Sequence, residues 1–93
     1  MRIIKLTSQF KKDLKKVRKQ PLKNRGIDIL DSIILPKLLI DEPLEHKYRD
    51  HELTGFSPPK RDCHVLSDLV LLYRITDEYL ILYRLGSHSE LFQ

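Results

Sequence analysis

The sequence holds a single cysteine, Cys63, so it cannot form an internal disulfide, and we expect a protein of the reducing cytoplasm. No apolar run approaches the roughly 20 residues of a membrane-spanning helix, and the first ten residues lack the apolar core of a secretory signal. No repeat, low-complexity segment or linker marks a second domain. We therefore expect one small domain over residues 1–93, too short for a two-domain cofactor enzyme, with no membrane partner.

Acidic residues are scarce at the start of the chain. Residues 1–25 hold ten Lys and Arg and one acid, Asp13, for a formal charge of +9, whereas residues 26–93 hold seven basic and twelve acidic residues, for −5. Charge segregated in this way predicts a polyanionic partner that approaches the N-terminal part. A solvated, lysine-rich helix face is the alternative, and charge alone does not separate the two.

The first half of the chain has a strand pattern followed by two helical patterns. Residues 2–6 predict a strand, and Thr7 or Ser8 can cap a helix that ends at Pro21. The apolar stripe of this helix has spacings of four and three, at Phe10, Leu14 and Val17.

A second helix is predicted over residues 24–40. Pro36 lies inside this pattern and lacks an N–H donor, so a kink or interruption is expected in the last turns. Asp41-Glu42-Pro43 ends the helical half, and the polar stretch after it reads as an ordered loop.

The second half of the chain predicts three strands, over residues 61–66, 69–75 and 79–85, the last two forming an antiparallel hairpin. Alternation places Leu69, Leu71, Tyr73 and Ile75 on one face of the middle strand. Because both faces are apolar, we expect central strands covered by the helices. The order βααβββ predicts an α+β fold, with a small antiparallel sheet packed against two N-terminal helices.

Four histidines, whose side chains titrate at a pKa of about 6.5 when unperturbed, all follow residue 45. Strand ends that meet at one edge of the sheet can bring together His64, Asp68, Arg84 and His88. On the strand, His64 shares a face with Asp62 and opposes Cys63. His51 follows an aspartate in a polar stretch, whereas His46 has no such setting.

A metal site is not expected. Cys63 and His64 are adjacent on a strand and point to opposite faces, and no zinc-type spacing occurs. Cys63 is also unsuited as a nucleophile because it shares a face with Val65. What remains is a set of imidazoles, a carboxylate and an arginine, with no cofactor.

That set suits RNA cleavage by the 2′-hydroxyl of the substrate itself. This reaction needs a base for the hydroxyl proton, an acid for the leaving 5′-oxygen, and cations that stabilise the phosphorane. Phe92 near the C-terminus could stack on a base, or it could be a hydrophobe packed on the sheet, and the sequence leaves both open.

Three motifs resemble those of the YafQ-like toxins in the RelE/ParE superfamily: DHELTG at 50–55, RDCHV at 61–65 with Asp68, and LYRLGSHSELF at 82–92. The resemblance covers nearly the whole chain and implies a RelE-like fold. It also implies a bacterial type II toxin that cleaves mRNA in the ribosomal decoding site without metal. The residues onto which the family's functional positions fall are His51, His64, Asp68, Arg84, His88 and Phe92.

The resemblance implies a role for each of these residues. His88 would be the general acid, and Asp68 or His64 the base. His51 and Arg84 would stabilise phosphate charge. Phe92 would help to place the nucleotide. Arg61, which lies outside this set, is also expected to bind substrate.

The resemblance also implies partners. A cognate antitoxin, expected to be a dimer with a ribbon-helix-helix part, would neutralise the toxin and would provide its only contact with operator DNA. The expected docking surface for ribosomal RNA phosphates is formed by Lys11, Lys12, Lys15, Lys16 and Lys19. Two alternatives are a ParE-like toxin that inhibits gyrase without catalysis and a plain nucleic-acid-binding module. The histidine set argues against the ParE-like alternative, whereas in the plain binding module the histidines would be incidental.

Overall fold

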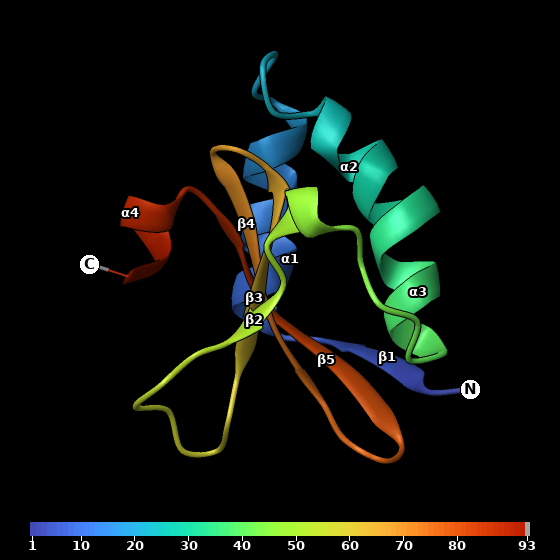
Figure 1. Ribbon diagram of the computed structural model, residues 1–93. Coiled ribbons are helices and arrows are strands. Elements are labelled where there is room, and N and C mark those ends of the chain that lie inside the picture. The colour runs from blue at the N-terminus through green and yellow to red at the C-terminus, as the bar shows by residue number, and fades with distance from the viewer. Residues whose placement is uncertain (93) are drawn as a thin grey trace.

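Five strands form one mixed sheet in the order β1-β5-β4-β3-β2, and three helical segments cover one of its faces (Figure 1). The computed structural model describes residues 1–92. The strands are β1 (Ile3–Leu6), β2 (His51–Glu52), β3 (Arg61–Leu66), β4 (Leu69–Ile75) and β5 (Tyr79–Gly86). The helices are α1 (Ser8–Arg18), α2 (Arg25–Ile29), α3 (Leu35–Leu39) and α4 (His88–Phe92).

The predicted α+β class is confirmed, and the three C-terminal strands lie where the sequence placed them. The sheet differs from the predicted antiparallel one because β1 pairs with β5 in parallel, with Ile3 opposite Tyr79. The pairing partner of the first strand is non-local, and strand periodicity carries no information on it. Two short elements were also not predicted: β2, inside the expected loop, and the C-terminal helix α4.

Helix α1 begins as the sequence predicted. Thr7 caps it, because the Thr7 hydroxyl oxygen accepts a hydrogen bond from the Phe10 N–H at 3.0 Å. The same hydroxyl donates to the Tyr83 carbonyl at 2.8 Å, which ties the start of α1 to β5. Phe10 and Val17 are buried, whereas Leu14 is half-buried.

The second predicted helix is continuous but contains a π-helical turn, Leu30–Ile34, between α2 and α3. There the Leu35 N–H donates to the Leu30 carbonyl, five residues back. Pro36 follows at once and cannot donate a hydrogen bond, so a widened turn lets the helix continue past it. The predicted interruption therefore takes the form of a wide turn and not of a break.

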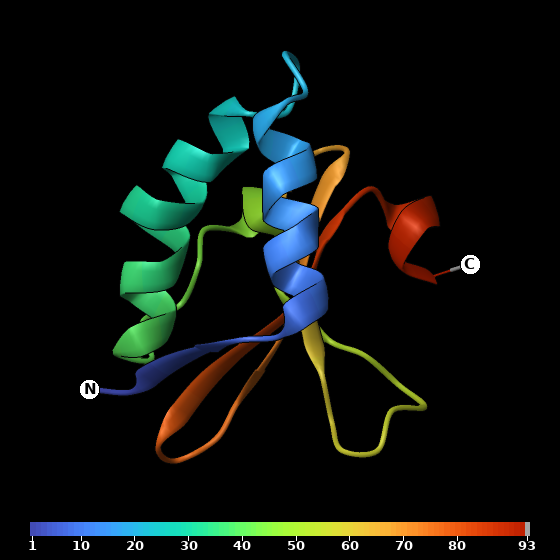
Figure 2. The ribbon, with the colours of Figure 1, turned by 180° about the vertical axis from the view of Figure 1, so that it is seen from behind.

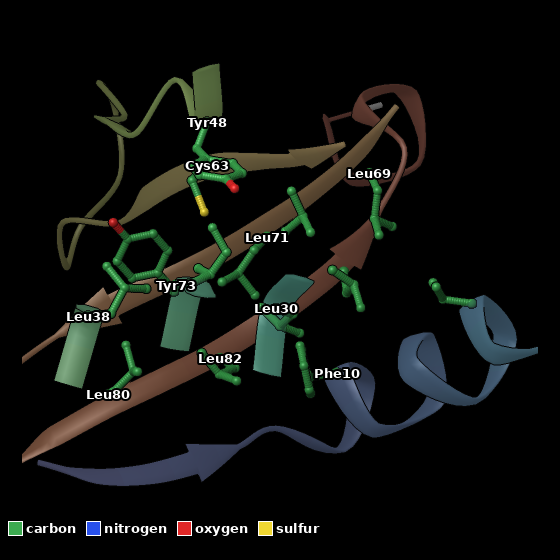
Figure 3. Packing of buried hydrophobic residues seen from close by; sticks show 14 residues of the cluster. Phe10, Leu30, Leu38, Tyr48, Cys63, Leu69, Leu71, Tyr73, Leu80 and Leu82 are labelled. Atoms are coloured by element: carbon green, nitrogen blue, oxygen red, sulfur yellow. The ribbon is translucent and has the colours of Figure 1, made fainter. Parts of the chain in front are cut away.

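The hydrophobic core lies between the sheet and the helices, and Figure 3 shows Leu71 and Tyr73 of β4 in it with Leu30 and Leu38. The alternation predicted for β4 is confirmed, since Leu69, Leu71 and Tyr73 are fully buried on this side. Gly26 permits the close approach of α2, because a Cβ there would overlap Cδ2 of Leu69.

The opposite face of the sheet is also apolar at its centre, where Val70 and Leu72 are buried. Figures 1 and 2 both place the sheet between α4 on one side and α2 and α3 on the other. No helix in residues 1–92 is long and apolar enough to cross a membrane.

Candidate active site

The face of the sheet opposite α2 and α3 carries two of the predicted site histidines. His51 of β2 pairs with Asp62 of β3, and Asp62 and His64 share this face because they alternate with Cys63. Cys63 is fully buried in the core, and burial raises the pKa of its thiol, so it stays protonated. The predicted division of β3 into a core side and a polar side is therefore confirmed.

His51 is held by the backbone of the preceding turn. Its Nδ1 lies 2.7 Å from the Arg49 carbonyl oxygen and 3.2 Å from Oδ1 of Asp62. Both neighbours are acceptors, so the arrangement favours the tautomer in which Nδ1 carries the proton. Nε2 of His51 is then left as a proton acceptor. Arg49 supplies its carbonyl from a left-handed conformation, with φ at 49°.

Asp50 anchors the turn that carries His51. The Tyr73 hydroxyl donates a short hydrogen bond to Asp50, and Nη2 of Arg61 lies 3.4 Å from Oδ2 of the same carboxylate. Burial and this hydrogen bond raise the pKa of Tyr73, which stays neutral. Arg61 was predicted to bind substrate, but its guanidinium is engaged with Asp50 and Tyr73, as an anchor of the turn.

Asp62 is the site residue that sequence reasoning missed. Its side chain is buried, and Oδ1 has no hydrogen-bond partner within residues 1–92, since the 3.2 Å approach of His51 lacks hydrogen-bond geometry. Burial raises the pKa of Asp62, and the nearby His51, His64 and His88 oppose that shift. One buried carboxylate therefore has His51 at 3.2 Å, shares its face of β3 with His64, and feels the charge of His88 as well. The signal was the Asp-x-His spacing on β3, which placed Asp62 beside His64.

His88 and Phe92 lie one turn apart on α4, with ring centroids 4.7 Å apart and planes tilted by 43°. A capping box starts this helix: Ser87 N–H donates to Glu90 Oε1 at 2.9 Å, and Glu90 N–H donates to the Ser87 hydroxyl at 3.2 Å. Glu90 also forms an ion pair of 2.5 Å with Lys16 of α1. The Lys16 ammonium and the Ser87 hydrogen bonds lower the pKa of Glu90 to about 2.

Within residues 1–92, no hydrogen bond or ion pair joins Arg84 of β5 to a histidine. The Nε of Arg84 donates to Oδ2 of Asp13 at 2.8 Å, and the Leu85 N–H donates to the same oxygen at 3.0 Å. Asp13 is buried, although it is the sole acid of a helix rich in lysine. The hydrogen bond from Arg84 to Asp13 leads the causes that raise the pKa of Arg84.

Asp68 and the docking lysines lie outside this cluster. Asp68 is exposed in the turn between β3 and β4, and within the described residues it makes no hydrogen bond or ion pair with a histidine. Val70 pairs with Gly86, which places this turn at the same end of the sheet as the start of α4. The remaining docking residues are exposed, namely Lys11, Lys12, Lys15 and Lys19.

Comparison with known proteins decides the family. A family model described as a bacterial toxin of type II toxin-antitoxin system, YafQ, matches residues 2–93. The chain belongs to the YafQ family of type II toxins. It is similar to the mRNA interferase toxin YafQ of Escherichia coli K12, with 34% identity over 91 residues that cover 98% of this chain and 96% of that protein.

Solved YafQ structures share the fold over the whole chain. The E. coli DinJ–YafQ complex is similar at a TM-score of 0.83 and 33% identity, covering 100% of both chains. A copper-bound mutant toxin from Helicobacter pylori gives a TM-score of 0.87 and 40% identity, covering 99% of this chain and 100% of that one. The expected RelE-like fold is confirmed. In residues 1–92 of this YafQ chain, no three His, Cys, Asp or Glu side chains are arranged to hold a metal ion.

Proposed function

We propose that this toxin is a ribosome-dependent endoribonuclease that cleaves mRNA without a metal ion. The observation that carries the proposal is the buried Asp62 carboxylate with His51 at 3.2 Å and His64 on the same face of β3, where the charges of His51, His64 and His88 all act on Asp62. Imidazoles both give and take protons near neutral pH, which is what cleavage by a 2′-hydroxyl requires. The name of the E. coli relative, an mRNA interferase, supports the same reaction.

His51 is proposed as the general base. With the proton on Nδ1, facing the Arg49 carbonyl and Asp62, its Nε2 can take the proton of the substrate 2′-hydroxyl. The 2′-oxygen then attacks phosphorus, and the bond from phosphorus to the 5′-oxygen breaks. This assignment differs from the one that the resemblance implied, which made Asp68 or His64 the base. The exposed Asp68 lacks any comparable hydrogen bond to a histidine in the described chain.

His88 is proposed as the general acid, which protonates the departing 5′-oxygen. The products are a 2′,3′-cyclic phosphate and a 5′-hydroxyl, so the reaction consumes no cofactor. Phe92 stacks against His88 and presents an aromatic face to a nucleotide base. Arg84, held by Asp13, supplies positive charge for the phosphorane oxygens, and the His64 imidazole supplies a hydrogen-bond donor.

The proposed partners follow from the same reading. The ribosome would be contacted through the exposed lysines of α1, and mRNA through the histidine face, which places the toxin in the cytoplasm. The E. coli relative is found in a complex with its antitoxin DinJ. We propose a cognate antitoxin here too, a dimer with a ribbon-helix-helix part that alone contacts operator DNA. Co-expression of the neighbouring reading frame should relieve growth arrest.

Primer extension on mRNA translated in a reconstituted system tests the nuclease. His88→Ala and His51→Ala should each lower cleavage by about 10²–10⁴-fold, because each removes one proton transfer. His46→Ala, a change at an exposed histidine outside the cluster, should leave cleavage unchanged. Cleavage that persists in His88→Ala would contradict the proposal. Gyrase inhibition with intact mRNA would favour the ParE-like alternative.

A further inference from the structure

A cavity of about 420 Å³ adjoins His64 on the side away from α4 and is not used by the mechanism above. It lies between the 3-10 turn His46–Tyr48, the end of α2 and the end of β3. This volume is within the range of pockets that bind small molecules. Because His64 borders both the cavity and the histidine cluster, a polymer bound across the cluster would pass over the cavity.

The walls of the cavity suit a flat, partly apolar ring. Ile29, Val65 and Leu66 supply apolar surface, and Val65 is buried. Lys47 and Arg49 line the same cavity and are exposed, so their charges stand at its opening. An apolar slot with cations at its mouth matches a nucleobase attached to a phosphate.

The backbone at the cavity can read the edge of a base. The pairing of β2 with β3 covers only Arg61 and Asp62, so the second half of β3 has no strand on that side. Within residues 1–92, no backbone hydrogen bond joins residues 64–66 to residues 46–49. The unpaired N–H and C=O groups of an edge strand are free to bond a ligand.

We propose that this cavity binds the base of a nucleotide next to the scissile phosphate, and that it contributes to the choice of cleavage site. The proposal rests on the proposed function and extends it to sequence preference. Lys47 and Arg49 hold the flanking phosphate, and the base enters between Ile29 and the edge of β3. The Arg49 carbonyl also binds Nδ1 of His51. The same turn therefore both contacts the nucleotide and orients His51, the proposed general base.

Cleavage-site mapping on ribosome-translated mRNA tests the proposal with the double variant Arg49→Asn/Lys47→Gln. Asparagine tolerates the left-handed backbone of residue 49, so the turn that holds His51 is retained. The matched control is Arg25→Gln/Lys37→Gln, which removes the same charge away from the cavity. Without the phosphate anchor the base is no longer held in the cavity, so sites whose base fills it should be cleaved at least tenfold less, whereas sites that do not use the cavity should change little. The control should keep the wild-type pattern.

A preference unchanged in the double variant overturns the cavity proposal, whatever happens to the overall rate. Cleavage that is absent from the wild type, or that survives His88→Ala, overturns the nuclease proposal instead. A titration of isotope-labelled protein with each of the four 5′-mononucleotides then decides the cavity separately. Changes in the amide chemical shifts of Leu66 and Ser67 that occur in the wild type and are lost in the double variant support binding in the cavity. The absence of such changes in the wild type overturns it.

Discussion

Arg84 of β5 is bound by Asp13 of α1, with 2.8 Å between Nε and Oδ2. Asp13 is the only acidic residue of α1. It orients the guanidinium of Arg84, to which the resemblance assigns phosphate binding. The Leu85 N–H shares the carboxylate, which fixes its position against β5. The contact makes Asp13 a positioning residue for Arg84.

Asp13→Asn should lower both the stability of the protein and its cleavage of mRNA. The amide oxygen can still accept from the Leu85 N–H, so we expect a loss of about 1–3 kcal/mol in unfolding free energy, from weakened bonds to Arg84. Cleavage at saturating ribosome concentration should fall at least tenfold. Urea unfolding and primer extension measure the two effects. The control is Gln9→Ala, which removes a side-chain amide that donates a hydrogen bond to Asp13, and it should change cleavage little.

Asp62→Asn should stabilise the protein at neutral pH while it impairs the site. The folded-state pKa of Asp62 is raised, so the ionised carboxylate reduces stability as pH rises above its ordinary value of 3.8. Removing the charge removes that penalty, and the variant should be at least as stable as the wild type at pH 7. Thermal melting checks this, and primer extension should show reduced cleavage. If Asp62→Asn is clearly less stable than the wild type at neutral pH, the prediction is wrong and the ionised carboxylate stabilises the folded protein.

Glu90→Gln isolates the ion pair between α4 and Lys16, because glutamine can still complete the capping box. The folded-state pKa of Glu90 is depressed to about 2 from 4.5, so its stabilising effect is present above pH 4.5 and is lost as pH falls toward 2. The stability difference between wild type and variant should follow that window. Unfolding curves at stepped pH measure it, and a difference independent of pH across the window would refute the assignment to Lys16.

The exposed lysines of α1 should govern association with the ribosome in a salt-dependent way. Lys12→Glu should weaken binding and lower the slope of log affinity against log salt by about 1, as expected for one lost phosphate contact. Lys37→Glu, in α3, is the control of equal charge change and should keep the slope. Lys16 is unsuitable for this test, since its ammonium is already paired with Glu90. Binding measured by sedimentation over a range of salt concentrations distinguishes the outcomes.

Local patterns predicted the elements of this fold, and non-local contacts account for what they missed. The alternation of β4 was predicted from neighbouring residues, as was a cap at Thr7 or Ser8, of which the structure has Thr7. The parallel partner of β1 lies more than seventy residues away, and no local pattern encodes it. The wide helical turn depends on Pro36 but also on how the helix packs, so the sequence indicated an irregularity and not its form.

The candidate site shows the same difference between what local patterns predict and what depends on non-local contacts. Strand parity predicted that His64 and Asp62 share a face, yet only the structure shows that Asp62 is buried and lies 3.2 Å from His51. Arg61 and Arg84 were assigned to substrate by resemblance, and their carboxylate partners, Asp50 and Asp13, became visible only in three dimensions. The sequence of a motif does not reveal whether a charged side chain in it is already paired with an opposite charge in the folded protein.

The place of β5 between β1 and β4 has a consequence for when the toxin becomes active. β1 is synthesised more than seventy residues before its hydrogen-bonding partner, which begins at Tyr79, and His88 follows only after that strand is complete. A growing chain therefore cannot close its sheet, or carry its proposed acid, until β5 and α4 have left the ribosome. A nascent toxin would thus stay inactive through most of its own synthesis.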